Sequence, residues 1–135
     1  MHKLIELPKV LDPRGNLTFL QYPDQVPFGI KRIFWTYDVP GGEKRGGHAF
    51  KEQKEIIIAL SGSFDIIISL PDGTTEKVSL NRSYYGLYMS PLTWRHMENF
   101  STNALALHLA STHFDKEDYL YDFGDFKNFK GNDSI

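Results

Sequence analysis

Glu55-Ile56-Ile57-Ile58-Ala59-Leu60 is the stretch that decides the fold of this chain. It is short, rich in β-branched isoleucine and apolar on both faces, which predicts a strand buried between two layers. A Ser61-Gly62-Ser63 turn leads into a second apolar run, Phe64-Asp65-Ile66-Ile67-Ile68-Ser69-Leu70. Pro71-Asp72-Gly73 then makes a hairpin into a strand over 75–80. The centre of the chain is therefore predicted to consist of strands.

Further strand-like segments lie on both sides of this centre. Alternating or aromatic-rich runs occur at 17–21, 30–37, 85–90 and 104–111, with Gly and Pro turns between them. Short strands at near-regular spacing are typical of a sandwich or a barrel. In the tail, 115–130, the aromatic residues are spaced as in one or two short helices that cap a barrel end. The sequence predicts one all-β domain over 1–135 with a short C-terminal helical tail.

Composition narrows the classes of function. The chain has 135 residues, a formal net charge of -2 and no cysteine. A nearly neutral chain has no field that would draw it to nucleic acid or to an anionic membrane. The lack of cysteine excludes disulfides, thiolate zinc sites and a cysteine nucleophile. No signal peptide and no apolar run of ~20 residues is evident, so we expect a cytoplasmic protein.

The motif with the most chemistry is Arg45-Gly46-Gly47-His48-Ala49-Phe50-Lys51, followed by Glu55 and Gly62. It resembles the first motif of the cupin superfamily, in which two histidines one residue apart share a metal ion with a glutamate. The resemblance implies a jelly-roll barrel. Phe50 stands at the position of the second histidine, and phenylalanine has no lone pair for a metal.

The second cupin motif is altered as well. It contains Trp94-Arg95-His96, and an arginine beside the site would repel a cation. A metal site of His48, His96 and Glu55 would depart from the usual geometry of the cupin metal site. We therefore expect neither a metal nor another cofactor.

A lone histidine in a barrel suits proton transfer. An unperturbed histidine has a pKa of roughly 6.5, so it is largely neutral near pH 7 and accepts a proton. Abstraction of a proton beside a carbonyl needs such a base and a positive or hydrogen-bonding group for the developing enediolate. Arginine can take the second role, and it also binds a diphosphate through two hydrogen bonds. The arginines considered for these roles are Arg14, Arg32, Arg45 and Arg95.

Five segments in order are similar to the TDP-4-keto-6-deoxyglucose 3,4-ketoisomerases, the cupins that feed 3-amino-3,6-dideoxyhexose synthesis. The segments are Leu11-Asp12-Pro13-Arg14-Gly15-Asn16-Leu17, Pro27-Phe28-Gly29-Ile30-Lys31-Arg32, Arg45-Gly46-Gly47-His48-Ala49, Gly86-Leu87-Tyr88 with Pro91 and Trp94, and Leu109-Ala110-Ser111 with Asp115, Asp118-Tyr119 and Phe126. The resemblance runs from about residue 5 to residue 130.

This resemblance implies a metal-free homodimer that binds a TDP-linked keto-deoxysugar. It implies that His48 takes the proton from sugar C3 and returns one at C4, so that the ketone moves from C4 to C3. Arg45 and Tyr37 are the catalytic candidates beside His48. The candidates for substrate binding are Arg14, Arg32, Trp35, Tyr88, Arg95 and His96.

Departures from the family pattern leave two questions open. His96 is a candidate for any relay role lost with the histidine that Phe50 replaces. In the family, the residues at positions 14 and 95 are together linked to which face of C4 is reprotonated. This chain has arginine at both positions, which fits neither of the family's patterns. The galacto or gluco configuration of the product therefore stays open.

Two further residues have competing interpretations. Trp35, like Tyr85, could stack on a thymine base, but aromatic residues of β proteins mostly pack in the core. His108 shares a face of its predicted strand with Ala104 and Ala106 and could point into the barrel. We treat Trp35 as a core residue that is also a candidate for the site.

Three rival functions remain from the sequence alone. A nucleotide-sugar 3,5-epimerase is also a cupin with a histidine base, and it would exchange the proton at sugar C5. A binding module would hold a sugar nucleotide without turnover. A metal-dependent oxygenase would contain metal on analysis of the purified protein.

Overall fold

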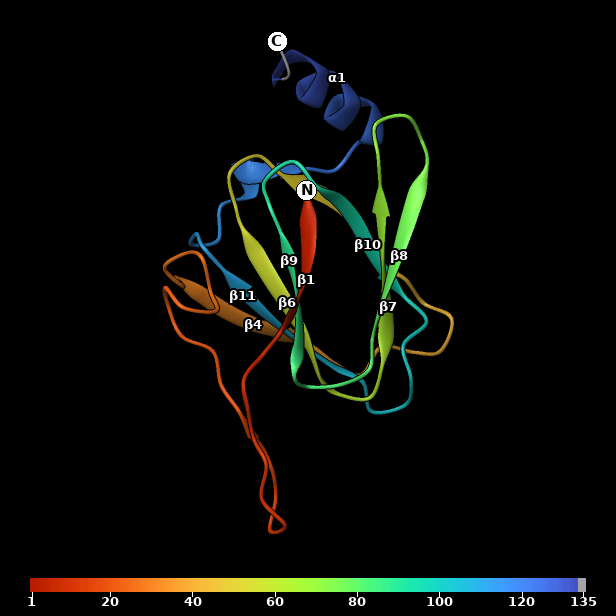
Figure 1. The fold of residues 1–135 in the computed structure, drawn as a ribbon. Coiled ribbons are helices and arrows are strands. Elements are labelled where there is room, and N and C mark those ends of the chain that lie inside the picture. Colours follow the sequence, from red (N-terminus) through yellow and green to blue (C-terminus); the bar gives the residue numbers. More distant parts are fainter. Residues whose placement is uncertain (134–135) are drawn as a thin grey trace.

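Two five-stranded antiparallel sheets pack into a barrel (Figure 1). The computed structural model describes residues 1–133. The first sheet contains, in spatial order, β1 (His2–Glu6), β9 (Tyr85–Met89), β6 (Glu55–Ser61), β11 (Leu105–Ala110) and β4 (Arg32–Thr36). The second contains β12 (Tyr119–Leu120), β5 (Arg45–Phe50), β10 (Trp94–Glu98), β7 (Phe64–Ser69) and β8 (Thr75–Leu80). The prediction of an all-β cupin-type jelly roll is confirmed.

The turns of the central stretch have different roles. β7 and β8 form the predicted hairpin, with Phe64 opposite Leu80 and Ser69 opposite Thr75. β6 and β7 do not pair with each other, because they lie in different sheets. The turn at 61–63 therefore carries the chain from one sheet to the other.

The main core lies between the two sheets. Ile57 and Ala59 of β6 pack in one buried cluster with Phe64, Ile66 and Ile68 of β7. These residues alternate along their strands, so one face of each strand supplies the core. Burial of their apolar surface is the main term that stabilises the barrel.

A second apolar layer covers the outer face of the first sheet. Ile56 and Ile58 of β6 and Leu109 of β11 are buried in a cluster with Val26 and Phe28. The segment that precedes β4 thus covers the sheet from outside. This second layer explains why the run 55–60 is apolar on both faces.

The tail forms the predicted helical cap. A short 3-10 helix, η1 (Lys116–Asp118), precedes β12, and α1 runs over Phe123–Asp133 at the top of the barrel in Figure 1. Asp122 Oδ1 accepts the Asp125 amide hydrogen at 2.9 Å and caps the helix. Phe126 is buried against Trp94 of β10. No helix within residues 1–133 has the length and apolar character needed to span a bilayer.

The N-terminal part differs from the prediction in extent. The strand expected over 17–21 pairs only at β3 (Leu17–Thr18), with β2 (Lys9–Val10). These two short strands belong to neither large sheet. Figure 1 shows this hairpin, in red-orange, extending away from the barrel at the end opposite α1. We call residues 9–18 the N-terminal hairpin.

Candidate active site

β5 places His48 on the inner face of the second sheet. His48 lies opposite Arg95 of β10, and the register between the two strands shifts at Arg95 and His96. Gly46, two residues earlier, has a φ of 95° and approaches β10 closely. A Cβ atom at Gly46 would lie 3.1 Å from the His96 Cα and 3.3 Å from the Arg95 carbonyl oxygen. Glycine is therefore required for β5 to take this path.

His48 opens into a cavity of about 410 Å³ between the two sheets. β4, β5, β11 and β12 all contribute to its wall. The lining residues are Phe34, Thr36, Lys44, Arg45, Gly46, His48, Met97, His108 and Tyr119. A smaller hollow of about 220 Å³ shares Phe34 and Tyr119 with this cavity and adds Arg32 and Phe114. We call the two together the His48 cavity.

Burial keeps His48 neutral at pH 7. Loss of hydration, then the positive charge of Arg95, lower the pKa of His48 to about 4, although the negative charge of Glu55 acts in the opposite direction. The ring is packed among aromatic side chains, with centroids 4.9 Å from Phe50 and 5.3 Å from Tyr119. A neutral imidazole in a fixed orientation can accept a proton from a bound molecule.

Positive charge gathers at the edge of the His48 cavity. Lys44 and Arg45 line it, and both are exposed. In the adjoining hollow, Arg32 donates a hydrogen bond to Gln53 at 3.0 Å, and its guanidinium lies 4.9 Å from the Phe34 ring centroid. These cations give the cavity the electrostatics that an anionic ligand requires.

Besides the two candidates from β10, four predicted site residues do not line the His48 cavity of their own chain. Trp35 is on the outer side of the first sheet and 57% exposed, so the core interpretation of Trp35 is wrong. Tyr37, just after β4, is 61% exposed. Tyr88 also lies on that side, where its ring is 6.4 Å from Phe28. Arg14 is on the N-terminal hairpin and pairs with Asp12 at 2.9 Å.

The two candidates from β10 have opposite orientations. Arg95 is buried below the cavity and donates a hydrogen bond from Nη1 to Glu55 Oε1 at 2.9 Å. His96 points to the other side of the sheet, where its Nε2 lies 2.7 Å from Glu98 Oε1. Neither is among the residues that line the cavity. His96 is therefore not in the position of the histidine that Phe50 replaces.

Several lining residues were not predicted as site residues from the sequence, among them Phe34, Thr36, Lys44 and Tyr119. Phe34 and Thr36 alternate with Trp35 on β4, so the choice of the inward face decided which of them meets the ligand. Tyr119 was noted only as one of the aromatic residues of the tail and as part of the last segment that resembles the family. Burial raises the pKa of Tyr119, so its phenol keeps its proton. The pairing of Tyr119 with Phe50 across β12 and β5, which places it beside His48, is a long-range contact with no local signal.

Comparisons with known proteins agree with this geometry. The profile of the FdtA family, described as WxcM-like, C-terminal, matches residues 1–131. The chain belongs to this family. A TDP-4-oxo-6-deoxy-α-D-glucose-3,4-oxoisomerase of Aneurinibacillus thermoaerophilus is 34% identical over 129 residues, which are 95% of this chain and 91% of that protein.

Solved structures of FdtA-like enzymes superpose closely on this chain. QdtA, a sugar 3,4-ketoisomerase of Thermoanaerobacterium thermosaccharolyticum solved with TDP, has a TM-score of 0.94 and 30% identity, covering 99% of this chain and 97% of its own. A variant of QdtA was solved with TDP-4-keto-6-deoxyglucose. The WlaRB TDP-quinovose 3,4-ketoisomerase of Campylobacter jejuni has a TM-score of 0.89 and 38% identity, covering 94% and 97%. The 3,4-ketoisomerase resemblance seen in the sequence is confirmed.

In this FdtA-family chain, the glutamate of the first cupin motif is engaged by other side chains. Glu55 is buried, pairs with Arg95 at 2.9 Å and lies 2.6 Å from His108 Nδ1. Burial alone would raise the pKa of Glu55, but the hydrogen bond to His108 and the charge of Arg95 lower it to about 2. Within residues 1–133, no group of three or more His, Cys, Asp or Glu side chains has a geometry that could hold a metal ion.

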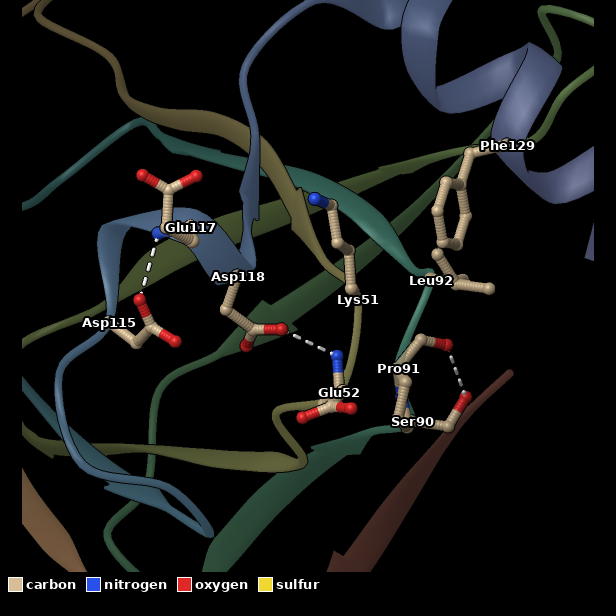
Figure 2. Close-up of a pocket in the computed structure, with 9 residues that line it drawn as sticks. All are labelled: Lys51, Glu52, Ser90, Pro91, Leu92, Asp115, Glu117, Asp118 and Phe129. Carbon is tan, nitrogen blue, oxygen red and sulfur yellow. Dashed lines mark hydrogen bonds between the residues drawn. The ribbon is translucent and has the colours of Figure 1, made fainter.

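A second hollow, of about 550 Å³, lies beside α1 and is drawn in Figure 2. Its lining residues are Lys51, Glu52, Ser90, Pro91, Leu92, Asp115, Glu117, Asp118 and Phe129. The carboxylate of Asp118 accepts the Glu52 amide hydrogen at 2.8 Å, and Asp115 accepts that of Glu117 at 3.0 Å. The four carboxylates would repel a diphosphate, so the His48 cavity is the candidate active site of this family member.

Proposed function

We propose that the protein is an isomerase that converts TDP-4-keto-6-deoxyglucose to a TDP-3-keto-6-deoxyhexose. The observation that carries the proposal is a neutral, buried His48 in a cavity with positive charge at its edge. The oxoisomerase and ketoisomerase relatives, and the complexes of QdtA with TDP and with TDP-4-keto-6-deoxyglucose, support this substrate. The scheme requires no cofactor.

In the proposed reaction, His48 first removes the proton from sugar C3. The electron pair of the C3–H bond forms a C3=C4 double bond, and the carbonyl electrons move to O4. Arg45 and Lys44 stabilise the negative charge of this enediolate, since both line the same cavity as His48. The imidazolium of His48 then protonates C4, and the ketone re-forms at C3.

The diphosphate of TDP needs separate positive charge. Arg32 supports this role because it lines the adjoining hollow, and its Nε and Nη1 are buried without a hydrogen-bond partner among residues 1–133. Tyr119 lines both hollows, so in this scheme it would lie between the reacting sugar and the diphosphate. These assignments place binding and chemistry in adjoining parts of one cavity.

We also propose that the protein acts as a homodimer. Large apolar side chains are exposed on the N-terminal hairpin and on the outer face of β4, and a sizeable apolar patch of this kind is typical of an interaction surface. They are Val10, Leu11, Leu17, Ile33 and Trp35. A second copy of the chain would cover both surfaces. In such a dimer, Arg14 on the hairpin would serve the cavity of the partner subunit, as it does not line that of its own chain.

NMR of the reaction in D2O tests the proposed function. Chelator-treated protein is expected to convert TDP-4-keto-6-deoxyglucose to a 3-keto sugar with deuterium at C4, and the H4 coupling will give the galacto or gluco configuration. His48→Asn should lower turnover by at least about 1000-fold and keep TDP affinity, since the base is lost and the diphosphate site remains. His96→Asn is the matched control and should keep the wild-type rate.

Other results would overturn the proposal. Deuterium at C5 would indicate a 3,5-epimerase. TDP binding without exchange at any sugar carbon would indicate a binding module. Turnover of His48→Asn near the wild-type rate would exclude His48 as the base.

A further inference from the structure

A chain of hydrogen bonds leads from the buried interior to the wall of the His48 cavity. Arg95 Nη1 donates to Glu55 Oε1 at 2.9 Å, and Glu55 Oε2 lies 2.6 Å from His108 Nδ1. On the other side of the ring, His108 Nε2 lies 3.0 Å from Thr36 Oγ1. Thr36 and His108 both line the cavity that contains His48. The chain therefore ends in a hydroxyl group at the reaction site.

The surroundings of His108 hold its ring in a single orientation. The imidazole is stacked on Phe34, with ring centroids 4.3 Å apart and an interplanar angle of 9°. Glu55 and Arg95 are each 2% exposed, so the carboxylate that faces Nδ1 is itself fixed by a buried ion pair. Because this carboxylate is ionised, Nδ1 carries the hydrogen and Nε2 faces the Thr36 hydroxyl as an acceptor.

Ketoisomerisation, on which this inference rests, moves two protons and not one. The first goes from C3 to C4, and His48 transfers it in the proposed reaction. The second must go from the hydroxyl O3 to the new hydroxyl O4. A single imidazole that carries the carbon proton cannot hold the second proton at the same time. The reaction therefore needs a second acid-base group in the cavity.

We infer that Thr36, His108 and Glu55 form this second group, a relay that transfers the hydroxyl proton from O3 to O4. Thr36 contacts the sugar hydroxyls, His108 stores the proton, and Glu55 stabilises the resulting imidazolium. O3 and O4 are on neighbouring carbons, so one threonine hydroxyl can reach both. Thr36 is thus a catalytic residue, and His108 and Glu55 are positioning residues that act through it.

The protons and electrons balance over the two transfers. After His48 has taken the C3 proton, Thr36 accepts the O3 proton and passes its own proton to His108 Nε2. The imidazolium then returns a proton through Thr36 to O4. The O3 electrons form the new C3=O3 bond, and the C3=C4 pair takes the proton of His48 at C4. Both histidines end neutral, as they began.

The test compares Thr36→Val, Thr36→Ser, His108→Gln and the double variant Thr36→Val/His108→Gln. Thr36→Val keeps the shape of the side chain and removes the hydroxyl, so kcat should fall about 100-fold with KM and TDP affinity unchanged. His108→Gln should show the same loss. The double variant should be no slower than either single variant, because both changes break the same relay. Thr36→Ser keeps a hydroxyl and should retain most of the rate.

Each outcome has a distinct meaning. The relay would be overturned if Thr36→Val had a kcat within about twofold of wild type, or if the losses multiplied in the double variant. The proposed function would still stand in either case, because the wild-type protein would show ketoisomerase turnover. A wild-type protein without ketoisomerase turnover would overturn both. If His108→Gln fails to fold, as judged by its melting curve and TDP binding, Thr36→Val and Thr36→Ser still decide the question.

Discussion

At the scale of single residues, burial determines the protonation state of His48. The imidazole is surrounded by Phe50 and Tyr119 and faces the positive charge of Arg95 across the strand pair. Loss of hydration and this charge both disfavour the imidazolium, so the pKa of His48 is lowered to about 4. A base of low pKa is ready to accept a proton at pH 7. It is also weak, so the proposed reaction depends on Arg45 and Lys44 to stabilise the enediolate.

The pH dependence of the rate should report this lowered pKa. The base is active when neutral, so kcat/KM is expected to stay constant as the pH falls through 6.5 and to decrease only near the folded-state pKa of about 4. Initial rates between pH 8 and pH 4.5, in buffers of constant ionic strength, measure the profile. An acidic limb centred at 6.5 or above would show that His48 is not a desolvated base.

The same pKa has a consequence for the free energy of unfolding. The unfolded chain binds a proton at His48 below about 6.5, and the folded protein does so only near 4, so stability is lost as the pH falls between these values. Urea unfolding should show wild type losing about 1–2 kcal/mol more than His48→Asn between pH 7 and pH 5. Glu55, whose pKa is lowered to about 2, loses its contribution only below about 4.5, outside this window.

Sequence alone identified some of the site residues and misplaced others for a physical reason. His48 and Arg45, which the sequence predicted as site residues, both line the cavity, and the glycines beside them give this strand a local signature. On β4, alternation separates Trp35 from Phe34 and Thr36 but does not reveal which face is inward. Both faces of β4 carry an aromatic residue, because the outer face is also apolar although it is exposed in the single chain.

At the scale of elements, the closeness of β5 and β10 holds the site together. β10 pairs with both β5 and β7, and Arg95 lies opposite His48 on one side and Ile68 on the other. The register shift beside Arg95 is accommodated by Gly46 and Gly47, which both have positive φ. The sequence predicted β6 and β7 from hydrophobic runs and β8 from the hairpin turn before it, whereas β10 has a mixed polar sequence, Trp94–Glu98, with neither signal. The position of β10 follows only from its pairing with β5 and β7 in the structure.

Gly46→Ala tests this arrangement, with Gly47→Ala as its matched control. Both changes introduce a side chain at positive φ, which costs about 1 kcal/mol or more of stability. Only at Gly46 does the new Cβ meet β10, whereas at Gly47 nothing lies within 4 Å. Gly46→Ala should therefore lower the free energy of unfolding more, and it should also reduce kcat, because His48 follows on the displaced strand. Equal losses in urea unfolding would show that strand closeness does not matter here.

At the scale of the whole molecule, a single chain leaves two apolar surfaces exposed, and Arg14 is among the predicted site residues that do not line the cavity of their own chain. The N-terminal hairpin extends from the barrel (Figure 1). The Arg14 side chain at its turn is 91% exposed. An apolar hollow of about 230 Å³, lined by Phe19, Leu60 and Leu107 among others, lies on the outer side of the first sheet. A homodimer would cover these surfaces and bring Arg14 to the cavity of the partner subunit.

Mixed dimers provide a direct test of this arrangement. Arg14→Ala and His48→Asn chains, carrying different tags and produced together, should each be poorly active as homodimers. If Arg14 serves the partner's cavity, each mixed dimer contains one cavity with both His48 and Arg14. Random assembly makes half of the dimers mixed, so about a quarter of wild-type activity should return. If Arg14 serves its own cavity or none, no cavity of a mixed dimer is more active than the cavities of the two homodimers. The rate of the mixture then stays low. A sedimentation coefficient of a monomer for the wild-type chain would contradict the dimer itself.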